Sequence, residues 1–199
     1  MKRFYFLYIV CLLAHFVASA QDQTTYFEAF DGHDAGWSEE STVKSSTKII
    51  YGHYEMYHKR SSGGYCYYKD FYPELNGDFT LETKIMQTLG EDNHGFGLLW
   101  GGKGANDCYN FMISSNGYFS IGEWSEGKFT SLKSWTKISV GNDKFKYNKV
   151  AVRRAGGRLQ FYVNDTEVYD MKDLPLKGFK FGFNLKAAMK VKADYFKFE

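Results

Sequence analysis

The sequence lacks an excess of charge of either sign. It carries 25 Lys and Arg against 23 Asp and Glu, and two of the basic residues are Lys2 and Arg3. Residues 21–199 therefore have a formal charge of 23 − 23 = 0. A chain with this balance has no electrostatic surface of the kind that binds nucleic acid or an anionic membrane. We therefore expect no nucleic-acid partner.

The apolar run near the amino terminus is too short to span a membrane. It extends over Phe4–Val17, whereas a transmembrane helix requires about 20 apolar residues. The run follows a basic start and precedes Ala18-Ser19-Ala20, which fits the small-x-small cleavage pattern of a secretory signal peptide. We predict that residues 1–20 are removed on export, that the mature chain does not insert into a membrane, and that it is secreted or lies in the periplasm or cell envelope.

Proline is scarce and helical periodicity is absent. There are two Pro against 16 Tyr and 18 Phe, a composition that favours β-structure. Apolar side chains instead recur at every second residue, which places one set on each face of a sheet. This alternation predicts strands at residues 79–86, 108–113, 117–124, 150–152, 159–163 and 179–183.

Turn-forming pairs separate these segments. Asn76-Gly77, Asn116-Gly117 and Gly156-Gly157 supply the positive φ that tight hairpins need, and Asn164-Asp165 is a weaker example. Short strands between such turns indicate an all-β sandwich or barrel. With no linker, repeat or low-complexity segment, residues 24–199 are expected to form one domain.

A match to a phosphate-binding loop is accidental. Gly97-Leu-Leu-Trp-Gly-Gly-Lys-Gly104 fits the spacing G-x-x-x-x-G-K. A phosphate loop leads into a helix, and its Lys is followed by Ser or Thr. Here Lys103 is followed by Gly104 and then by a predicted strand. We therefore expect the end of a strand rather than a nucleotide site.

Motifs for covalent catalysis are also missing. The sequence has no G-x-S-x-G nucleophile elbow and no Cys beside a base. Glycoside hydrolysis needs two facing carboxylates, and the acids considered for that role, Glu82, Glu123 and Glu126, have no motif that pairs them. No catalytic residue is assigned. The two cysteines of the mature chain, Cys66 and Cys108, form either a disulfide or two separate buried thiols, and spacing does not decide between them.

Aromatic and polar residues offer a candidate binding surface. Sugar rings present apolar C–H faces that stack on Trp and Tyr, while amide and carboxylate side chains bind their hydroxyl groups. If Phe119 and Ile121 face the core, Tyr118 and Trp124 face the other side of their strand. The predicted ligand-binding residues are Trp100, Asn110, Tyr118, Glu123 and Trp124.

A structural calcium ion is a second possibility. A jelly roll brings its first and last strands side by side, so Glu28 or Asp31 is expected near Asp194. Carboxylates with backbone carbonyls suit Ca²⁺. The alternative is that Asp194 is a solvent-facing residue of an alternating strand.

Several segments, taken in order, resemble the concanavalin A-like lectin and glucanase superfamily. They are Phe30-Asp-Gly32 with Gly36-Trp37, Asp78–Ile85, Gly95–Gly101, Tyr109–Ile113, Asn116–Ile121, Asn148–Val152, Leu159–Asn164, Gly178–Phe183 and Asp194–Phe198. The resemblance covers essentially the whole mature chain and implies a jelly roll of two curved antiparallel sheets. Relatives of this kind include lectins, laminin G-type modules, family 16 glucanases and keto-disaccharide hydrolases, and many stand-alone exported members resemble bacterial envelope proteins of unknown role.

The resemblance carries over no catalytic residue, because the glucanase signature E-x-D-x-x-E is absent from every predicted strand. The leading hypothesis is an exported, non-catalytic module that binds a glycan or a cell-surface partner on its concave sheet. A sugar-hydrolysing enzyme and a structural or adhesive envelope module are the alternatives. The adhesive alternative predicts aromatic side chains that are wholly interior and a concave face lined with charge.

Overall fold

A computed structural model describes residues 25–32, 36–73, 77–140 and 143–199. The predicted signal peptide lies outside these residues, as does Asn76 of the first predicted turn. In the described residues there are fifteen β-strands and no helix, so the predicted all-β class is confirmed. No segment of the described chain forms a helix long and apolar enough to cross a bilayer.

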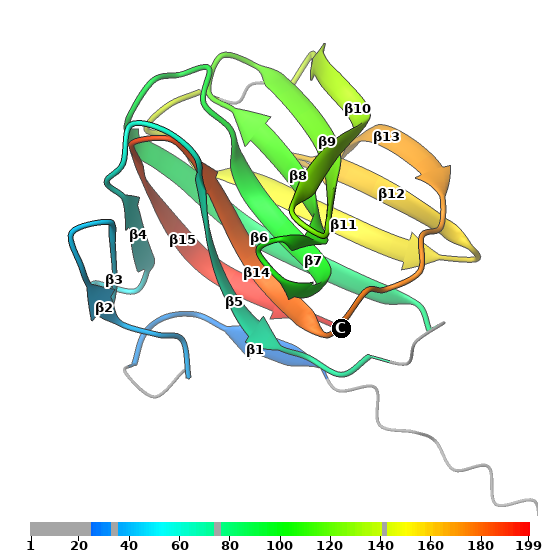
Figure 1. The fold of residues 1–199 in the computed structure, drawn as a ribbon, viewed down its shortest axis with the longest axis horizontal. Coiled ribbons are helices and arrows are strands. Elements are labelled where there is room, and N and C mark those ends of the chain that lie inside the picture. Colours follow the sequence, from blue (N-terminus) through cyan, green and yellow to red (C-terminus); the bar gives the residue numbers. More distant parts are fainter. Residues whose placement is uncertain (1–24, 33–35, 74–76, 141–142) are drawn as a thin grey trace, which may run out of the picture.

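The strands form two antiparallel sheets stacked face to face (Figure 1). The larger sheet has nine strands in the order β13-β12-β11-β6-β15-β4-β3-β2, with β1 paired to β15. Their bounds are β1 Tyr26–Glu28, β2 Glu40–Ser41, β3 Ser45–Ile49, β4 Tyr54–His58, β6 Phe79–Leu89, β11 Asn148–Ala155, β12 Arg158–Val163, β13 Thr166–Lys172 and β15 Met189–Phe198.

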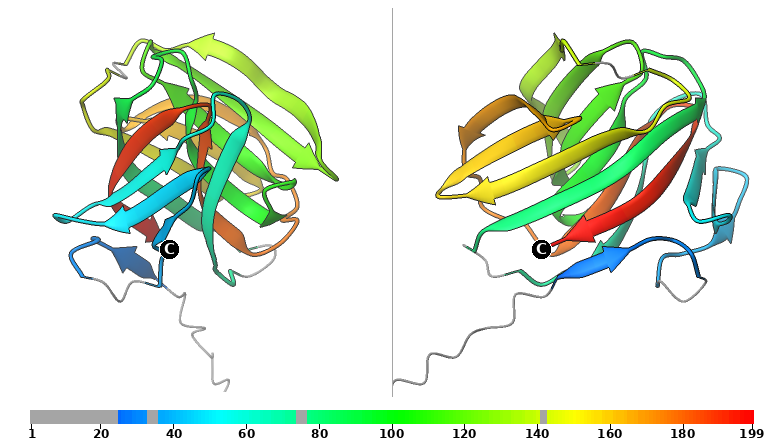
Figure 2. Two further views of the ribbon diagram at one scale, coloured as in Figure 1. Left: turned by 60° about the vertical axis from the view of Figure 1, so that its left-hand side comes forward. Right: turned by 180° about the vertical axis from the view of Figure 1, so that it is seen from behind.

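The smaller sheet lies in front of the larger one in Figure 1 and has six strands in the order β10-β9-β8-β7-β14-β5. Their bounds are β5 Gly64–Asp70, β7 Phe96–Gly104, β8 Asp107–Ser114, β9 Tyr118–Ser125, β10 Lys128–Lys137 and β14 Lys180–Lys186. Figure 2 shows the two layers from the side and from behind, where the larger sheet comes to the front. The predicted two-sheet antiparallel sandwich is confirmed.

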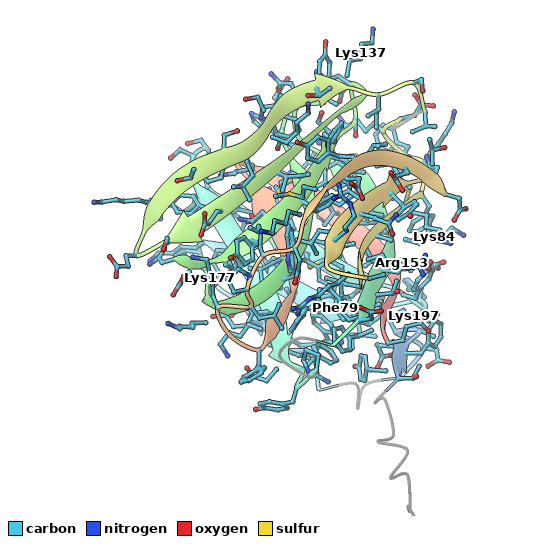
Figure 3. The ribbon with its side chains drawn as sticks, turned by 90° about the vertical axis from the view of Figure 1, so that its right-hand side faces the viewer. Phe79, Lys84, Lys137, Arg153, Lys177 and Lys197 are labelled. Atoms are coloured by element: carbon cyan, nitrogen blue, oxygen red, sulfur yellow. The ribbon has the colours of Figure 1, made fainter. Side chains whose placement is uncertain are left out.

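Alternation along each strand fills the space between the layers. In β6, the inward set begins with Phe79, Leu81 and Thr83, while Thr80 and Glu82 lie on the outer side. Figure 3 shows the result for several labelled residues: Phe79 lies between the sheets, and Lys84, Arg153 and Lys197 lie on the side of the larger sheet. The core is rich in rings, and its largest fully buried aromatic side chains are Phe30, Tyr54, Phe96, Trp100, Phe111, Phe119, Phe161, Phe181, Phe183 and Phe196.

The hairpin turns follow the predicted chemistry. Gly156 and Gly157 join β11 to β12 with φ of 57° and 74°, and Asn164 and Asp165 join β12 to β13 with φ of 49° and 64°. Two consecutive residues with positive φ are the mark of the two-residue hairpin whose twist matches that of the strands. The weaker pair therefore forms the same kind of turn as the two glycines.

The segment that matched a phosphate loop is β7. Phe96–Gly104 is a strand, and it pairs with β8 and β14 on its two sides. No helix follows it, as predicted. Both faces of β7 and β8 are buried. Other parts of the chain therefore cover the outer face of these strands as well as the inner face.

Two histidines give the fold a dependence on pH. His58 is the last residue of β4. Its side chain is 1% exposed, and the centroid of its ring lies 5.8 Å from that of Tyr65. Burial of the ring lowers the pKa of His58 below 6.5, although the nearby backbone of Lys44 and Ser62 acts in the opposite direction. Burial likewise lowers the pKa of His53, assisted by the charge of Lys192.

We therefore predict that the free energy of unfolding falls as pH decreases below about 6.5. In that range the unfolded chain takes up protons that the folded chain does not, which costs up to about 1.4 kcal/mol per pH unit for each histidine. Urea denaturation between pH 7.5 and 5.5 measures the slope, and His58→Gln is expected to reduce it. An unchanged slope in that variant would show that His58 does not carry the effect.

Candidate functional site

The outer face of the six-stranded sheet has a nearly flat floor. Across β14, β7, β8 and β9, one row of paired residues reads Asn184, Gly97, Met112 and Ser120. The next row contains Asn110 and Gly122. Glycine adds no side chain at its position in these rows, so the polar side chains of neighbouring strands can meet across the gap.

An irregular edge strand covers this floor. β10 pairs only with β9, and its register shifts between Ser131 and Lys133 and again between Lys133 and Thr136. Bulges of this kind bend a strand and re-aim its side chains. Trp135 lies within the second irregularity, and its ring lies over Gly95, where an added Cβ would be 2.8 Å from the ring carbon Cη2.

Two further rings complete the wall. Phe129 of β10 is paired with Trp124 of β9, and their ring centroids are 5.3 Å apart. The Phe129 ring also lies over Gly122, where a Cβ would be 2.3 Å from its Cε2. Glycine at this position is therefore required for the ring to lie against the sheet. Phe129 is 51% exposed and Trp135 is 46% exposed, so both rings face solvent as well as the floor.

Floor and wall enclose a pocket of about 120 Å³. It is lined by Asn110, Met112, Ser120, Gly122, Trp124, Phe129, Trp135, Asn184 and Lys186. An apolar cavity of about 150 Å³ holds a benzene ring. A partly open pocket of this size therefore has room for most of one six-membered ring.

A polar group on the floor has an unused acceptor. The Asn184 side chain is 3% exposed, and its Nδ2 donates to Oδ1 of Asn110 at 2.7 Å. Within the described residues, the buried Oδ1 of Asn184 accepts no hydrogen bond. A buried polar atom without a partner costs about 1–3 kcal/mol.

A lysine crosses the pocket. Lys186 ends β14, and its Nζ lies 5.4 Å from the centre of the Trp124 ring and 5.5 Å from that of Phe129. Both distances are within the range of cation–π attraction. The side chain therefore extends from β14 toward the wall formed by β9 and β10, above the floor residues.

The two cysteines are free thiols and form no disulfide. Cys66 and Cys108 lie on β5 and β8, on the same outer side as the pocket floor, and Asn110 Nδ2 lies 3.9 Å from Cys108 Sγ. Burial raises the pKa of each thiol to about 12. Because the thiolate is the nucleophile, these protonated thiols supply no nucleophile at neutral pH.

Two of the five predicted ligand residues line the pocket. Asn110 is on its floor and Trp124 is in its wall. Tyr118 lies on the same outer side of β9, two residues before Ser120, but is not among the lining residues. A role for each of these three in binding stays a prediction.

The other two predicted ligand residues, Trp100 and Glu123, do not line the pocket. Trp100 is 0% exposed and lies between the sheets, with its ring centroid 5.3 Å from Tyr109 and 5.6 Å from Phe161. Glu123 lies at the sandwich edge, where its Oε1 is 2.9 Å from Nζ of Lys177. The structure therefore does not bring Trp100 and Glu123 together with Trp124, because neighbours on a strand face opposite sides.

The predicted calcium ligands do not form a cluster. β1 pairs with β15 as expected, and Glu28 is opposite Phe196, but Oε1 of Glu28 accepts a hydrogen bond from the backbone N–H of Phe30 at 2.7 Å. Asp194 pairs with Lys84 on the outer side of the sheet, and Asp31 is exposed. Among the described residues, no group of three His, Cys, Asp or Glu is arranged to hold a metal ion. Calcium binding stays a prediction.

The acids considered for hydrolysis lie away from the pocket. Glu82 is on the outer side of the other sheet, where it accepts a hydrogen bond from Tyr195 at 2.5 Å and pairs with Lys149. Glu126 is in the turn between β9 and β10, with φ of 49°. None of the residues that line the pocket is Asp or Glu, so the pair of carboxylates that glycoside hydrolysis needs is not provided there.

Sequence reasoning missed most of the pocket. Phe129 and Trp135 lie on β10, a segment without regular alternation and therefore without a strand signal. Asn184 and Lys186 had a usable signal. Phe181 and Phe183 face the core, which places Asn184 and Lys186 on the outer side by parity.

No known family model matches the sequence. No curated protein matches it either. Several solved structures share its fold. The carbohydrate-binding module CBM66 of Bacillus subtilis is 18% identical, with a TM-score of 0.51 over 83% of this chain and 91% of that one. The β-glucanase of Bacillus licheniformis is 10% identical, with a TM-score of 0.64 over 89% and 99%.

The carbohydrate recognition domain of Emp47p is 11% identical, with a TM-score of 0.58 over 89% of this chain and 95% of that one. These structures are concanavalin A-like jelly rolls, so the resemblance found in the sequence is confirmed for the fold. At these identities the likeness shows the fold alone.

The same substitution at the two tryptophans is predicted to lower stability by different amounts. Trp100→Ala removes a fully buried ring and is expected to lower the free energy of unfolding by about 3–5 kcal/mol. Trp124→Ala removes a wall ring with one close aromatic neighbour and is expected to cost about 1 kcal/mol. Urea denaturation followed by circular dichroism compares them, and similar losses in both variants would contradict the placement of Trp124 outside the core.

Proposed function

We propose that the chain binds carbohydrate in the pocket on the outer face of its six-stranded sheet, without hydrolysing it. The observation that carries the proposal is the pocket itself, in which three aromatic side chains, Trp124, Phe129 and Trp135, surround a polar floor. A sugar ring has apolar C–H faces and a periphery of hydroxyl groups. Aromatic walls suit the faces, and Asn110, Ser120 and Asn184 suit the hydroxyls.

The polar floor strengthens this assignment. Asn110, Ser120 and Asn184 line the pocket, and sugar hydroxyl groups that enter together with a ring can pair with side chains of this kind. An aromatic hydrocarbon would fill the pocket but would offer these polar side chains no hydrogen bond. The carbohydrate recognition domain and the carbohydrate-binding module among the structural neighbours have the same fold, which makes sugar binding a natural use of such a sheet.

Two other functions have less support. A hydrolase would need carboxylates near the sugar, and the pocket lining contains none. An adhesive module without a small ligand predicts a concave face lined with charge and aromatic side chains that are all interior. Phe129 and Trp135 instead lie half exposed on the outer face of the six-stranded sheet.

We also propose that the protein acts outside the cytoplasm, since residues 1–20 have the basic start, apolar run and small-x-small site of a signal peptide. A free glycan or the glycan of a cell surface would be the partner there. Expression in an exporting host, followed by amino-terminal sequencing of the released protein, is expected to give Gln21 as the first residue. Retention of Met1 in the exported protein, or retention of the chain in the cytoplasm, would contradict this proposal.

The binding proposal is tested by isothermal titration of the protein, from which residues 1–20 have been removed, against a panel of neutral and acidic oligosaccharides. At least one is expected to bind, and Trp135→Ala is expected to weaken that binding by about tenfold or more, since buried aromatic contacts dominate such sites. Trp135→Phe keeps a ring in the wall and is expected to retain part of the affinity.

Tyr51→Ala serves as the matched control. Tyr51 is 91% exposed and lies between β3 and β4 of the other sheet, so its removal is expected to leave binding unchanged. Binding of no oligosaccharide by the wild type would overturn the proposal. Equal affinity in Trp135→Ala and the wild type would place the sugar elsewhere.

A further inference from the structure

The pocket has one charged side chain, and that charge has no carboxylate partner. About half of the lysines in the described strands form ion pairs, as Lys149 does with Glu82 and Lys180 does with Asp70. Among the residues that the structure describes, no Asp or Glu lies within ion-pair distance of Lys186, whose contacts are the two rings. Lys186 is thus a cation held over the opening of a pocket.

The position of Lys186 suits a group that is attached to a ring in the pocket. Its Cα lies beside Gly95, to whose carbonyl its backbone N–H donates at 2.8 Å, and it lies two residues along β14 from Asn184. On one side of the opening is Nζ of Lys186, and on the floor are the polar side chains of Asn110, Ser120 and Asn184. A ligand that satisfies both must carry an anionic group and a hydroxyl donor on one small ring.

We propose that the sugar bound in this pocket is acidic, and specifically a hexuronic acid residue of a polysaccharide. This inference rests on the proposed carbohydrate binding and names its substrate class. The carboxylate on C5 of the sugar pairs with Lys186, its hydroxyl groups contact the polar side chains of the floor, and the ring lies against the wall of Trp124, Phe129 and Trp135. An anion near Nζ supplies the counter-charge that the protein does not, and charge-assisted hydrogen bonds are the stronger kind.

The lining of the pocket is consistent with an anion. A carboxylate in the wall or floor would repel an acidic sugar, and none is present. The nearest paired acids along β8 and β9, Asp107 and Glu123, are neutralised by two lysines. Nζ of Lys177 lies 3.0 Å and 2.9 Å from their oxygens, and Nζ of Lys103 lies 3.6 Å from Asp107. They therefore leave the positive charge of Lys186 uncompensated.

The experiment uses pairs of probes that differ only in charge. Oligosaccharides of galacturonate, of mannuronate and of glucuronate are each titrated beside their carboxyl-reduced counterparts, in which –CO₂⁻ has become –CH₂OH and the ring and hydroxyls remain. At least one acidic probe is expected to bind about tenfold more tightly than its reduced counterpart. Raising the salt concentration from 0.05 M to 0.5 M is expected to weaken the binding of the acidic probe and to leave the binding of the neutral probe unchanged.

Lys186→Gln is expected to remove the preference, giving the acidic probe the affinity of its reduced counterpart. Lys192→Gln is the matched control, because it removes the same charge from the outer side of the other sheet and is expected to keep the preference. Thermal unfolding of both variants verifies that they fold.

The outcomes separate this inference from the function on which it rests. Equal binding of acidic and reduced probes, lost in Trp135→Ala, overturns the acidic preference and leaves carbohydrate binding in place. Binding of dextran sulfate without binding of any uronate overturns the choice of carboxylate. If no sugar binds, whether neutral or acidic, both proposals are overturned.

Discussion

The fold depends on aromatic rings packed between two sheets. Rings such as Trp37, Phe183 and Phe196 are in mutual contact, with centroids 4.9–5.4 Å apart. Protein interiors are close-packed, so inward positions on facing strands are restricted to side chains that fit one another. This constraint fixes which side of every strand faces outward. The outer row of Asn184, Met112 and Ser120 is therefore determined by the core rather than by any requirement of a ligand.

The alternation that makes the fold predictable also limits what sequence can reveal of the site. Where one set is aromatic and the other polar, as around Phe181 and Phe183, parity identifies both faces. It is ambiguous in Leu98-Leu99-Trp100, because both sets are apolar and either one fits the core, and there Trp100 was assigned to the wrong side. It fails in β10, where bulges break the period and no pattern remains to be read.

The two outer faces of the sandwich have different chemistry. The larger sheet carries ion pairs, among them Lys48 and Lys190 with Glu55, Lys84 with Asp194, and Lys149 with Glu82 and Asp165. Solvated pairs of this kind contribute little stability, but they keep this face hydrated and disfavour apolar contacts with it. The smaller sheet also has ion pairs, such as Lys180 with Asp70, but it carries in addition the exposed rings of Phe129 and Trp135 and, beside the pocket, the unpaired cation of Lys186. The two faces of the molecule thus differ, and the proposed binding site lies on only one of them.

The edge strand β10 supplies two of the three rings but none of its residues is fully buried. Exposed positions tolerate substitution with changes of roughly 0.5 kcal/mol or less. A gene encoding this scaffold could therefore vary Phe129, Trp135 and their neighbours at little cost to folding, while the central strands stay constant. Differences in specificity among descendants of this protein would then be found mainly in the ten residues of the edge strand β10.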